Sequence, residues 1–425
     1  MSAPAATARA DAAFATGDWQ QRYEDRGTLA RGGMSTIHSV FDRVMQRQVA
    51  MKVYDGRRDP VGLERFLEEA RLTGVLDHPN IVPVHDVQQD EGPLPTRFTM
   101  KLVEGETLAD LLERDGEQRL ESTRLEEILR IFLKVCDAVS FAHSRGVFHC
   151  DIKPSNVMVG SHGQVYLMDW GVAWEPGRRR ADDAPQPDGT RPHGAVSGTP
   201  AYMAPEQAWG RVQDIDRRTD VYGLGGLLYA TLTLRPPHDG RDGNHDLELA
   251  QAGTVLPPEE ATQDGPLPPG LCEITMRALD RDPARRHPTV DQLREAVESF
   301  LRGGGWFSPV RFAAGEVIVR EGDPPDAAYI ITEGRCEIFR ELEGQRRSIR
   351  EVGRGEVFGE TSIFGSSRRT ASVLALTEVT ALRVTRDALE RELERAGWLK
   401  PFVEALASRF IERDQRVREL EDAGN

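Results

Sequence analysis

Cysteine is scarce in this chain, and long apolar runs are missing. Only four cysteines occur among 425 residues, and no two of them form a C-x-x-C pair. A disulfide framework and a zinc cluster are therefore disfavoured, and a reducing, cytoplasmic location is predicted. The longest apolar stretch, YGLGGLLYATLTL at 222–234, falls short of the roughly 18 residues of a membrane span. We predict that it forms a buried core helix.

An excess of positive charge and a secretory leader are also missing. The chain carries 54 Lys and Arg against 69 Asp and Glu, a formal net charge of -15, which argues against nonspecific binding to nucleic acid or an anionic membrane. Residues 1–18 lack the basic start and continuous apolar core of a signal peptide. A short basic run at 178–180 is interpreted as a solvated loop rather than a docking site.

Length and composition divide the chain into parts. At 425 residues it exceeds what one hydrophobic core usually supports, so two or three domains are expected. We predict a disordered head at 1–22, a mixed α/β domain at 23–301, a glycine linker at 302–305 and a second domain at 306–425. The linker sequence RGGG combines φ freedom with poor helix propensity.

Local patterns refine this division, and the fold class expected of the whole chain is α+β. Residues 178–198 are polar and rich in Pro and Gly, which predicts a mobile loop. Short alternating runs at 312–385, separated by glycine-containing turns, predict an antiparallel barrel or sandwich. Helical spacing follows at 387–421, with a row of apolar residues near one face: Leu389, Leu393, Trp398, Phe402, Leu406 and Phe410.

Five short motifs occur in a fixed order in the first domain. They are LARGGMSTI at 29–37, VAMKVY at 49–54, FHCDIKPSN at 148–156, LMDWGVA at 167–173 and SGTPAYMAPEQ at 197–207. Each alone is more often an ordinary strand, turn or loop. Their order and spacing together resemble the eukaryotic-type (bacterial Hanks-type) serine/threonine protein kinases across about residues 23–301. The resemblance implies a two-lobed fold, ATP, Mg²⁺ and a protein substrate with Ser or Thr.

The resemblance also assigns the nucleotide site. Lys52 would bind the α and β phosphates and be oriented by an ion pair to Glu69, with Glu68 the less favoured partner. The residues expected around ATP are Leu29, Gly32, Gly33, Ser35, Ile37, Ala50, Lys52, Met100 and Val103, with hinge backbone at 101–103. A second ion pair, between Glu206 and Arg286, is expected to be buried and structural.

Four further polar residues complete the implied catalytic set. Asp151 would accept or orient the substrate hydroxyl, and Lys153 would steady the γ phosphate. Asn156 and Asp169 would hold Mg²⁺ through their side-chain oxygens. The set therefore needs positioning and charge stabilisation rather than a covalent intermediate.

Several positions depart from the family pattern. Ala30 and Ser35 stand where the glycine-rich loop has glycine, so weaker nucleotide binding is expected, but not its loss. Trp170 replaces the phenylalanine that follows the metal-binding aspartate. This change should be tolerated, because the position is an apolar plug.

Cys150 replaces an arginine that, in some relatives, pairs with a phosphorylated activation loop. A thiol cannot make the charge-assisted, bidentate bonds of a guanidinium, so control by that phosphate is expected to be lost. Thr190, Ser197 and Thr199 are open to modification, although the resemblance favours a role for Thr199 in organising substrate. Control is therefore expected from elsewhere in the chain.

A second resemblance lies in the C-terminal domain. The stretch VFGETSIFGSSRRTASV at 357–373 joins the pair Gly359 and Glu360 to Arg369, nine residues after the glutamate. With its flanking alternating runs, it resembles the phosphate-binding cassette of cyclic nucleotide-binding domains across about 306–400. That resemblance implies an antiparallel β-barrel (jelly roll) with flanking helices.

The cassette resemblance carries its own residue roles. Arg369 would neutralise the cyclic phosphate, and Glu360 would accept a hydrogen bond from the ribose 2′-hydroxyl. Thr361 and Ser362 would donate near the phosphate. Thr370 stands where some relatives use a hydroxyl to favour cGMP and others with a hydroxyl use cAMP, so the resemblance leaves the choice between the two open. A phosphorylation site or plain surface charge at RRTAS, 368–372, is the alternative interpretation.

Together these patterns predict a serine/threonine kinase regulated by cAMP or cGMP bound to the C-terminal domain. Closure of Trp398 and the terminal helix over the cassette is the expected route. Two alternatives stay open. One is a catalytically weak, nucleotide-sensing scaffold, suggested by Ala30 and Ser35; the other is an enzyme whose barrel is a ligand-blind docking module.

Overall fold

The structure is a computed structural model of the chain. It describes residues 19–32, 35–55, 60–88, 96–174, 198–262, 264–303, 306–324, 326–342, 345–360 and 368–395, with 401, 403 and 405. The loop predicted at 178–198 lies outside these residues, apart from Gly198. The chain divides into two compact units, built from 1–116, 130–255 and 278–292 and from 117–129, 256–277 and 293–425.

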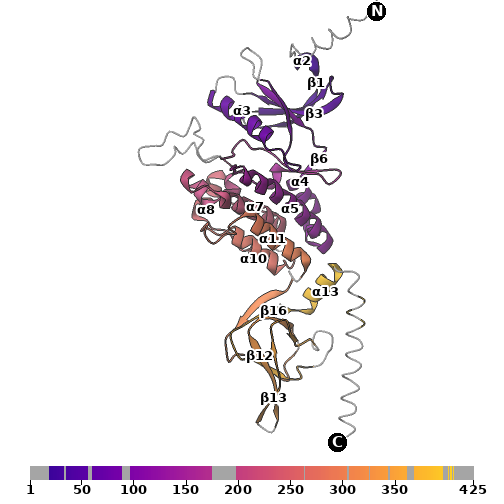
Figure 1. Ribbon diagram of the computed structural model, residues 1–425, viewed down its shortest axis with the longest axis vertical. Helices are drawn as coiled ribbons and strands as arrows, with labels where there is room; N and C mark the ends of the chain where they lie inside the picture. Colours follow the sequence, from indigo (N-terminus) through magenta and orange to yellow (C-terminus); the bar gives the residue numbers. More distant parts are fainter. Residues whose placement is uncertain are drawn as a thin grey trace, which may run out of the picture. The chain divides into compact units, whose positions relative to one another are not determined.

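The first unit opens with a five-stranded antiparallel sheet in the order β1-β2-β3-β5-β4, with helix α3 beside it (Figure 1). These elements are β1 (Tyr23–Arg31), β2 (Ser35–Asp42), β3 (Arg47–Tyr54), α3 (Pro60–Val75), β4 (Val84–Gln88) and β5 (Arg97–Lys101). Phe66 and Ala70 of α3 join Tyr54 and Phe98 of the sheet in one buried cluster. Because Lys52 is paired with Phe98 in the β3-β5 register, its side chain lies on the part of the sheet that α3 covers.

The first residues that the structure describes are helical. Residues Trp19–Arg22, which the sequence analysis assigned to a disordered head, form helix α2. Trp19 is buried and packs on Tyr23 with a ring separation of 4.9 Å, and Arg22 pairs with Asp42 at 2.9 Å. The prediction is wrong for these residues, because one aromatic anchor and one ion pair order a segment too short to show a periodic pattern.

The small sheet β6-β7-β8 and the remaining helices follow. The elements up to α7 are β6 (Gly105–Thr107), α4 (Leu108–Asp115), η1 (Gly116–Leu120), α5 (Ser122–Ser144), η2 (Pro154–Asn156), β7 (Val157–Gly160), β8 (Val165–Leu167), η4 (Pro200–Tyr202), α6 (Pro205–Ala208), η5 (Val212–Asp214) and α7 (Arg217–Thr233). They are followed by α8 (Gly243–Ala252), α9 (Pro258–Ala261), α10 (Pro269–Ala278) and α11 (Val290–Arg302).

Helix α7 contains most of the apolar stretch at 222–234. Its N-cap is Asp216, which accepts a hydrogen bond from the Arg218 N–H, and it ends where Leu234 adopts a left-handed φ of 58°. Every residue from Thr219 to Thr233 is buried, so the predicted core helix is confirmed. No helix in the described part of the chain is long and apolar enough to cross a bilayer.

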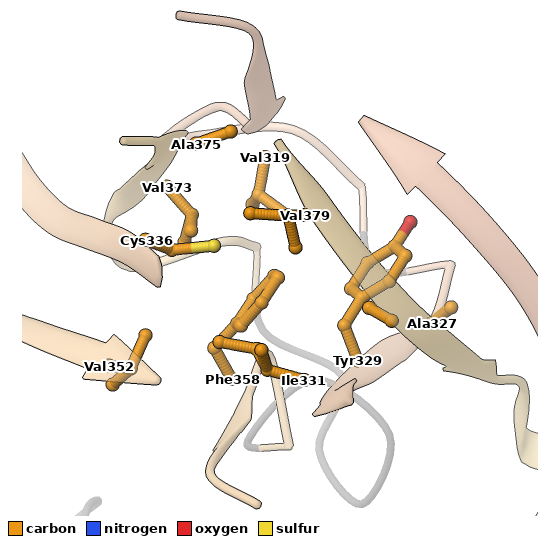
Figure 2. Close-up of a cluster of buried hydrophobic side chains, with 11 residues drawn as sticks. Val319, Ala327, Tyr329, Ile331, Cys336, Val352, Phe358, Val373, Ala375 and Val379 are labelled. Atoms are coloured by element: carbon orange, nitrogen blue, oxygen red, sulfur yellow. The ribbon is translucent and has the colours of Figure 1, made fainter. Parts of the chain in front are cut away.

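The second unit contains two four-stranded sheets, β10-β15-β12-β13 and β14-β11-β16-β9, whose strand pairs are all antiparallel. The strands are β9 (Ser308–Phe312), β10 (Val317–Val319), β11 (Ala328–Glu333), β12 (Arg335–Leu342), β13 (Gln345–Gly353), β14 (Val357–Phe358), β15 (Ser372–Ala375) and β16 (Val379–Val384). Figure 2 shows Ile331 and Phe358 of one sheet facing Cys336 and Val373 of the other. The predicted α+β class, with antiparallel sheets after the helical region, is thereby confirmed.

Two elements lie beside this core. Strand β13 is at the edge of its sheet, and residues 345–351 are all exposed. Helix α13 (Arg386–Arg395) follows β16 and begins the region predicted to be helical. Four residues predicted on the helical face lie outside the described residues: Trp398, Phe402, Leu406 and Phe410. All four cysteines of the chain are buried, and none of them forms a disulfide.

Candidate functional site

The first group of polar side chains lies between β3 and α3. Lys52 Nζ donates to both carboxylate oxygens of Glu69, at 2.6 and 2.8 Å, and lies 3.8 Å from Asp169 Oδ1. Burial opposes the charge on Lys52, but the carboxylates of Glu69 and Asp169 outweigh it and raise the pKa of Lys52. The ammonium therefore stays charged, and the structure brings Lys52, Glu69 and Asp169 together as the sequence analysis expected.

Asp151, Lys153 and Thr199 form a second group on the loop before η2 and on the segment before η4. Lys153 Nζ donates to Asp151 Oδ2 at 2.8 Å and also to Thr199 Oγ1. The Thr199 N–H donates to Asp151 Oδ1 at 2.8 Å. Burial alone would raise the pKa of Asp151, but the charge and hydrogen bond of Lys153 outweigh it and hold that pKa below its usual range. Asp151 is thus an ionised hydrogen-bond acceptor at neutral pH.

Asn156 and Asp169 supply oxygen atoms of the type that binds a divalent cation. The Asn156 amide nitrogen donates to the Asp151 carbonyl oxygen at 2.8 Å and to Asp151 Oδ2 at 3.2 Å. Its amide oxygen has no hydrogen-bond donor among the described residues and is left for another partner. The Asp169 side chain is 47% exposed. Mg²⁺ prefers carboxylate and carbonyl oxygens, so these residues fit that ion.

The loop 149–153, which carries Asp151 and is called the catalytic loop below after its predicted role, is strained at Cys150, where φ is +62°. This conformation costs energy for a residue with a side chain. Asp220 of α7 stabilises it, because its two carboxylate oxygens accept the N–H groups of Cys150 and His149, each at 2.8 Å. Gln207 Nε2 donates to the Cys150 carbonyl at 2.8 Å. The loop that presents Asp151 is therefore anchored without an arginine at position 150.

A cleft of about 740 Å³ is lined by Lys52, Glu69 and Asp169, and its volume is within the range of roughly 300 to 1,000 Å³ of small-molecule sites. The predicted nucleotide residues that line it are Leu29, Gly32, Ser35, Ile37, Ala50, Lys52, Met100 and Val103. Gly33 lies outside the described residues. A separate cavity of about 500 Å³ around Trp209 and Arg281 contains none of the predicted catalytic residues.

Glu206 and Arg286 form the buried ion pair that the sequence analysis expected. Two hydrogen bonds of 2.8 and 2.9 Å join the guanidinium to the carboxylate, and Thr219 donates to the same carboxylate at 2.9 Å. Both ionic side chains are almost fully buried. The pair fixes the start of α6, where Glu206 lies, to the loop before α11.

The second candidate site, in the β-sandwich, centres on Arg369, of which only 4% is exposed. Its Nη2 donates to Asp326 Oδ1 and to the Ala327 carbonyl, both at 2.6 Å. Its Nη1 lies 3.4 Å from the Gly359 carbonyl. A Cβ added at Gly359, whose φ is +78°, would approach Nη1 to 2.6 Å. Glycine is therefore required where the chain passes the guanidinium.

Two further cassette residues, Glu360 and Thr370, are chain neighbours of Gly359 and Arg369. Glu360 directly follows Gly359 and is half-buried. The Thr370 carbonyl accepts a hydrogen bond from Arg340 Nε at 2.7 Å. Thr361 and Ser362 lie outside the described residues. The structure thus places Gly359 and Arg369 in contact, with Glu360 and Thr370 adjacent to them in the chain.

Two acidic residues of these sites were missed from the sequence. Asp220 lies one position inside the buried part of α7, and a charged residue at the edge of an apolar run was the signal that could have indicated its role. Asp326 lies in a Gly-Asp-Pro-Pro-Asp turn before β11. An aspartate in a turn has so common a local role that no sequence signal singled it out.

Residues 23–297 match the family described as protein kinase domain. The chain belongs to the protein kinase family. Residues 309–396 of this kinase match the family described as cyclic nucleotide-binding domain. Both resemblances found in the sequence are therefore confirmed, in the same order along the chain.

Relatives of the kinase carry the name serine/threonine-protein kinase PknD. The protein from Chlamydia muridarum is 34% identical over 304 residues, covering 67% of this chain and 32% of the relative. The protein from Chlamydia trachomatis serovar D is 35% identical over 306 residues, covering 67% and 32%. The chain thus spans about a third of the length of these curated relatives.

Proposed function

We propose that this kinase transfers the γ-phosphate of ATP to serine and threonine hydroxyls of proteins. The observation that carries the proposal is the position of the Lys52–Glu69 pair 3.8 Å from Asp169, on a cleft of about 740 Å³. A charged ammonium beside a carboxylate is the arrangement that phosphate oxygens and a divalent cation need together. The name of the relatives supports serine and threonine as acceptors.

The chain's own residues would divide the work of phosphoryl transfer. Lys52, oriented by Glu69, would bind the α and β phosphates. Asp151 would accept a hydrogen bond from the substrate hydroxyl and orient it, since its low pKa keeps it ionised. Lys153, held 2.8 Å from Asp151, would steady the γ phosphate. The rate enhancement would come from the alignment of ATP with the acceptor hydroxyl, without a covalent intermediate.

Mg²⁺ is the cofactor that these residues would hold. Asp169 offers a carboxylate, and Asn156 offers an amide oxygen because its nitrogen is committed to Asp151. When bound, Mg²⁺ would neutralise charge on the phosphate oxygens. Ala30 and Ser35 replace two loop glycines, so we expect weaker nucleotide binding than a full glycine set would give.

A loss-of-function variant tests this proposal. Asp169→Asn keeps the shape of the side chain but removes a charge that the cation needs, so incorporation of labelled phosphate should fall to background. Asp214→Asn, which changes an exposed aspartate of the same unit, should leave incorporation unchanged. Retained autophosphorylation in Asp169→Asn would contradict the assignment.

We also propose that cAMP or cGMP binds the C-terminal domain and regulates the kinase. The buried guanidinium of Arg369, beside Gly359, would pair with the cyclic phosphate, and Glu360 would accept the ribose 2′-hydroxyl. A coupling of about 1 to 3 kcal/mol would change activity several-fold to about a hundredfold. Cys150 cannot bind an activation-loop phosphate as an arginine would. Control of the kinase by a ligand of the C-terminal domain is therefore expected instead.

Kinase assays with and without each cyclic nucleotide, repeated with Arg369→Ala, test the regulatory part. A ligand effect in the parent that disappears in the variant supports it, and the absence of any effect in either protein removes it. The bond between Arg369 and Asp326 favours one rival in particular, a ligand-blind docking module. Calorimetry with both nucleotides separates that rival from a ligand-binding domain.

A further inference from the structure

His238 lies outside every motif described above, yet it holds the segment that follows Thr199. Its side chain is fully buried. The backbone N–H of His238 donates to the Ala201 carbonyl at 3.2 Å, and Nε2 lies 3.1 Å from the Met203 carbonyl oxygen. A carbonyl only accepts hydrogen bonds, so this contact is a hydrogen bond in the tautomer whose Nε2 carries the proton, and we assign that tautomer. One residue thus bonds both ends of the short turn at 201–203.

The imidazole is itself fixed by its surroundings. The Tyr222 hydroxyl lies 2.9 Å from His238 Nε2, and the two rings stack with centroids 6.0 Å apart. Arg286 covers the Tyr222 ring at 4.8 Å and is held in turn by Glu206. Burial lowers the pKa of His238, with smaller opposing contributions from the backbone of Met203 and Thr254, so the ring is neutral at pH 7.

The segment that His238 bonds leads directly to the catalytic loop. Thr199 donates its N–H to Asp151 at 2.8 Å and accepts from Lys153, and helix η4 follows at once. Tyr202 of η4 packs so closely on α7 that a Cβ at Gly226 would lie 3.0 Å from its ring. Thr199, Tyr202 and Met203 line one small cavity together with Asp151, so an acceptor chain at Asp151 would lie next to residues 199–203.

We propose that His238 is a positioning residue for the protein substrate. The backbone N–H and the Nε2–H of His238 hold residues 199–203 in the form that aligns Thr199 and the acceptor chain with Asp151. The proposal rests on the kinase activity proposed above. It assigns to His238 no contact with ATP or with the reacting atoms. Its effect should consequently fall on the protein substrate and spare the nucleotide.

A purely packing role would not require a histidine. An apolar side chain of similar size fills a buried site without the cost of desolvating an imidazole. That cost is offset here because the imidazole N–H satisfies the carbonyl of Met203, which would otherwise lose this partner. The polar contacts are therefore directed at the segment beside the active site.

Two variants with side chains of nearly equal length separate a positioning role of His238 from a packing role. His238→Gln keeps a side-chain N–H near the position of Nε2, whereas His238→Met keeps the volume and removes the donor. With a protein substrate, His238→Met should raise KM for that substrate roughly five- to tenfold, the effect of one lost hydrogen bond. KM for ATP should stay within about twofold, and His238→Gln should retain parent values within about threefold.

Hydrogen exchange provides a readout that does not need activity. The N–H groups of Tyr202 and Met203 bond within η4, to Thr199 and Pro200, and should exchange faster in His238→Met but not in His238→Gln. Equal KM values and equal exchange in both variants would overturn the proposal, as would a common rise in KM for ATP. Failure of the parent to incorporate phosphate would count against the kinase activity instead, and the exchange result would still decide the role of His238.

Discussion

Asp326 places one carboxylate oxygen 2.6 Å from Nη2 of Arg369. Its other oxygen accepts from Arg383 at 3.0 Å, so one acidic side chain bridges two arginines. Burial would raise the pKa of Asp326, but hydrogen bonds from Arg383 and Arg369 outweigh it and hold that pKa below its usual range. An anionic ligand must therefore share Arg369 with an ionised carboxylate or displace it.

Removing the buried arginine should weaken anion recognition in the C-terminal domain. Arg369→Ala is expected to weaken binding of cAMP or cGMP at least tenfold, the effect of losing a charge-assisted hydrogen bond of about 1.5 to 3 kcal/mol. The neighbouring Arg368 is exposed and bonds only the Gly322 carbonyl in the described structure, so Arg368→Ala is the matched control. Calorimetry should show near-parent affinity for the control; equal losses in both variants would contradict the assigned role.

The Lys52–Glu69 pair should control the use of ATP. Glu69→Gln leaves a buried ammonium without its 2.6 Å counterion, so Lys52 should lose its orientation and kcat/KM for ATP should fall by roughly tenfold or more. Glu68→Gln changes the adjacent residue of the same helix and should alter kcat/KM by less than about twofold. A larger loss in Glu68→Gln than in Glu69→Gln would show that the wrong glutamate had been chosen.

The acid limb of the pH–rate profile should report on Asp151. Because the pKa of this carboxyl is held below its usual range, chiefly by Lys153 against the effect of burial, Asp151 stays ionised as the pH falls through the range in which an ordinary aspartate is protonated, near 3.9. Lys153→Met should therefore move the acid limb of kcat/KM to higher pH as well as lower its maximum. An acid limb at the same pH in both proteins would exclude Lys153 as the cause.

The buried Glu206–Arg286 pair should matter for stability. Arg286→Ala leaves Glu206 uncompensated in a site where its side chain is 6% exposed, and breaking such a pair typically costs about 3 to 5 kcal/mol in the free energy of unfolding. Arg285→Ala removes the preceding guanidinium, which is 76% exposed, and should cost less than about 0.5 kcal/mol. Urea unfolding measures both, and similar midpoints would refute the prediction.

Most residues of the candidate site could be proposed from the sequence because they occur in short motifs with a characteristic order and spacing. Lys52 and Asp169 lie 117 positions apart, yet both line the cleft of about 740 Å³. Asn156 bonds Asp151 at 3.2 Å, and its neighbour Ser155 also lines that cleft. The order of the motifs, rather than any single one, carried that information. The core helix at 222–234 could also be predicted from the sequence, because a helix that is buried on every face has a continuous run of apolar residues.

Residues that act through long-range contacts could not be predicted in this way. Asp326, Asp220 and His238 each bond a residue that is at least 35 positions away in the chain. Nothing in their immediate neighbours indicates a partner at that distance. Trp19 was missed for the same reason. Its burial depends on packing against residues of the following strands, and a four-residue helix is too short to show a periodic pattern that would predict this packing.

The exposed edge of β13 has a consequence for self-association. A strand at the margin of a sheet offers unpaired backbone groups to any second strand that approaches. Here that margin carries Arg346, Arg347 and Arg350 within residues 345–351, so two copies meeting edge to edge would place like charges opposite one another. The arginines should thus keep concentrated solutions of this kinase free of strand-mediated aggregates, most effectively at low ionic strength.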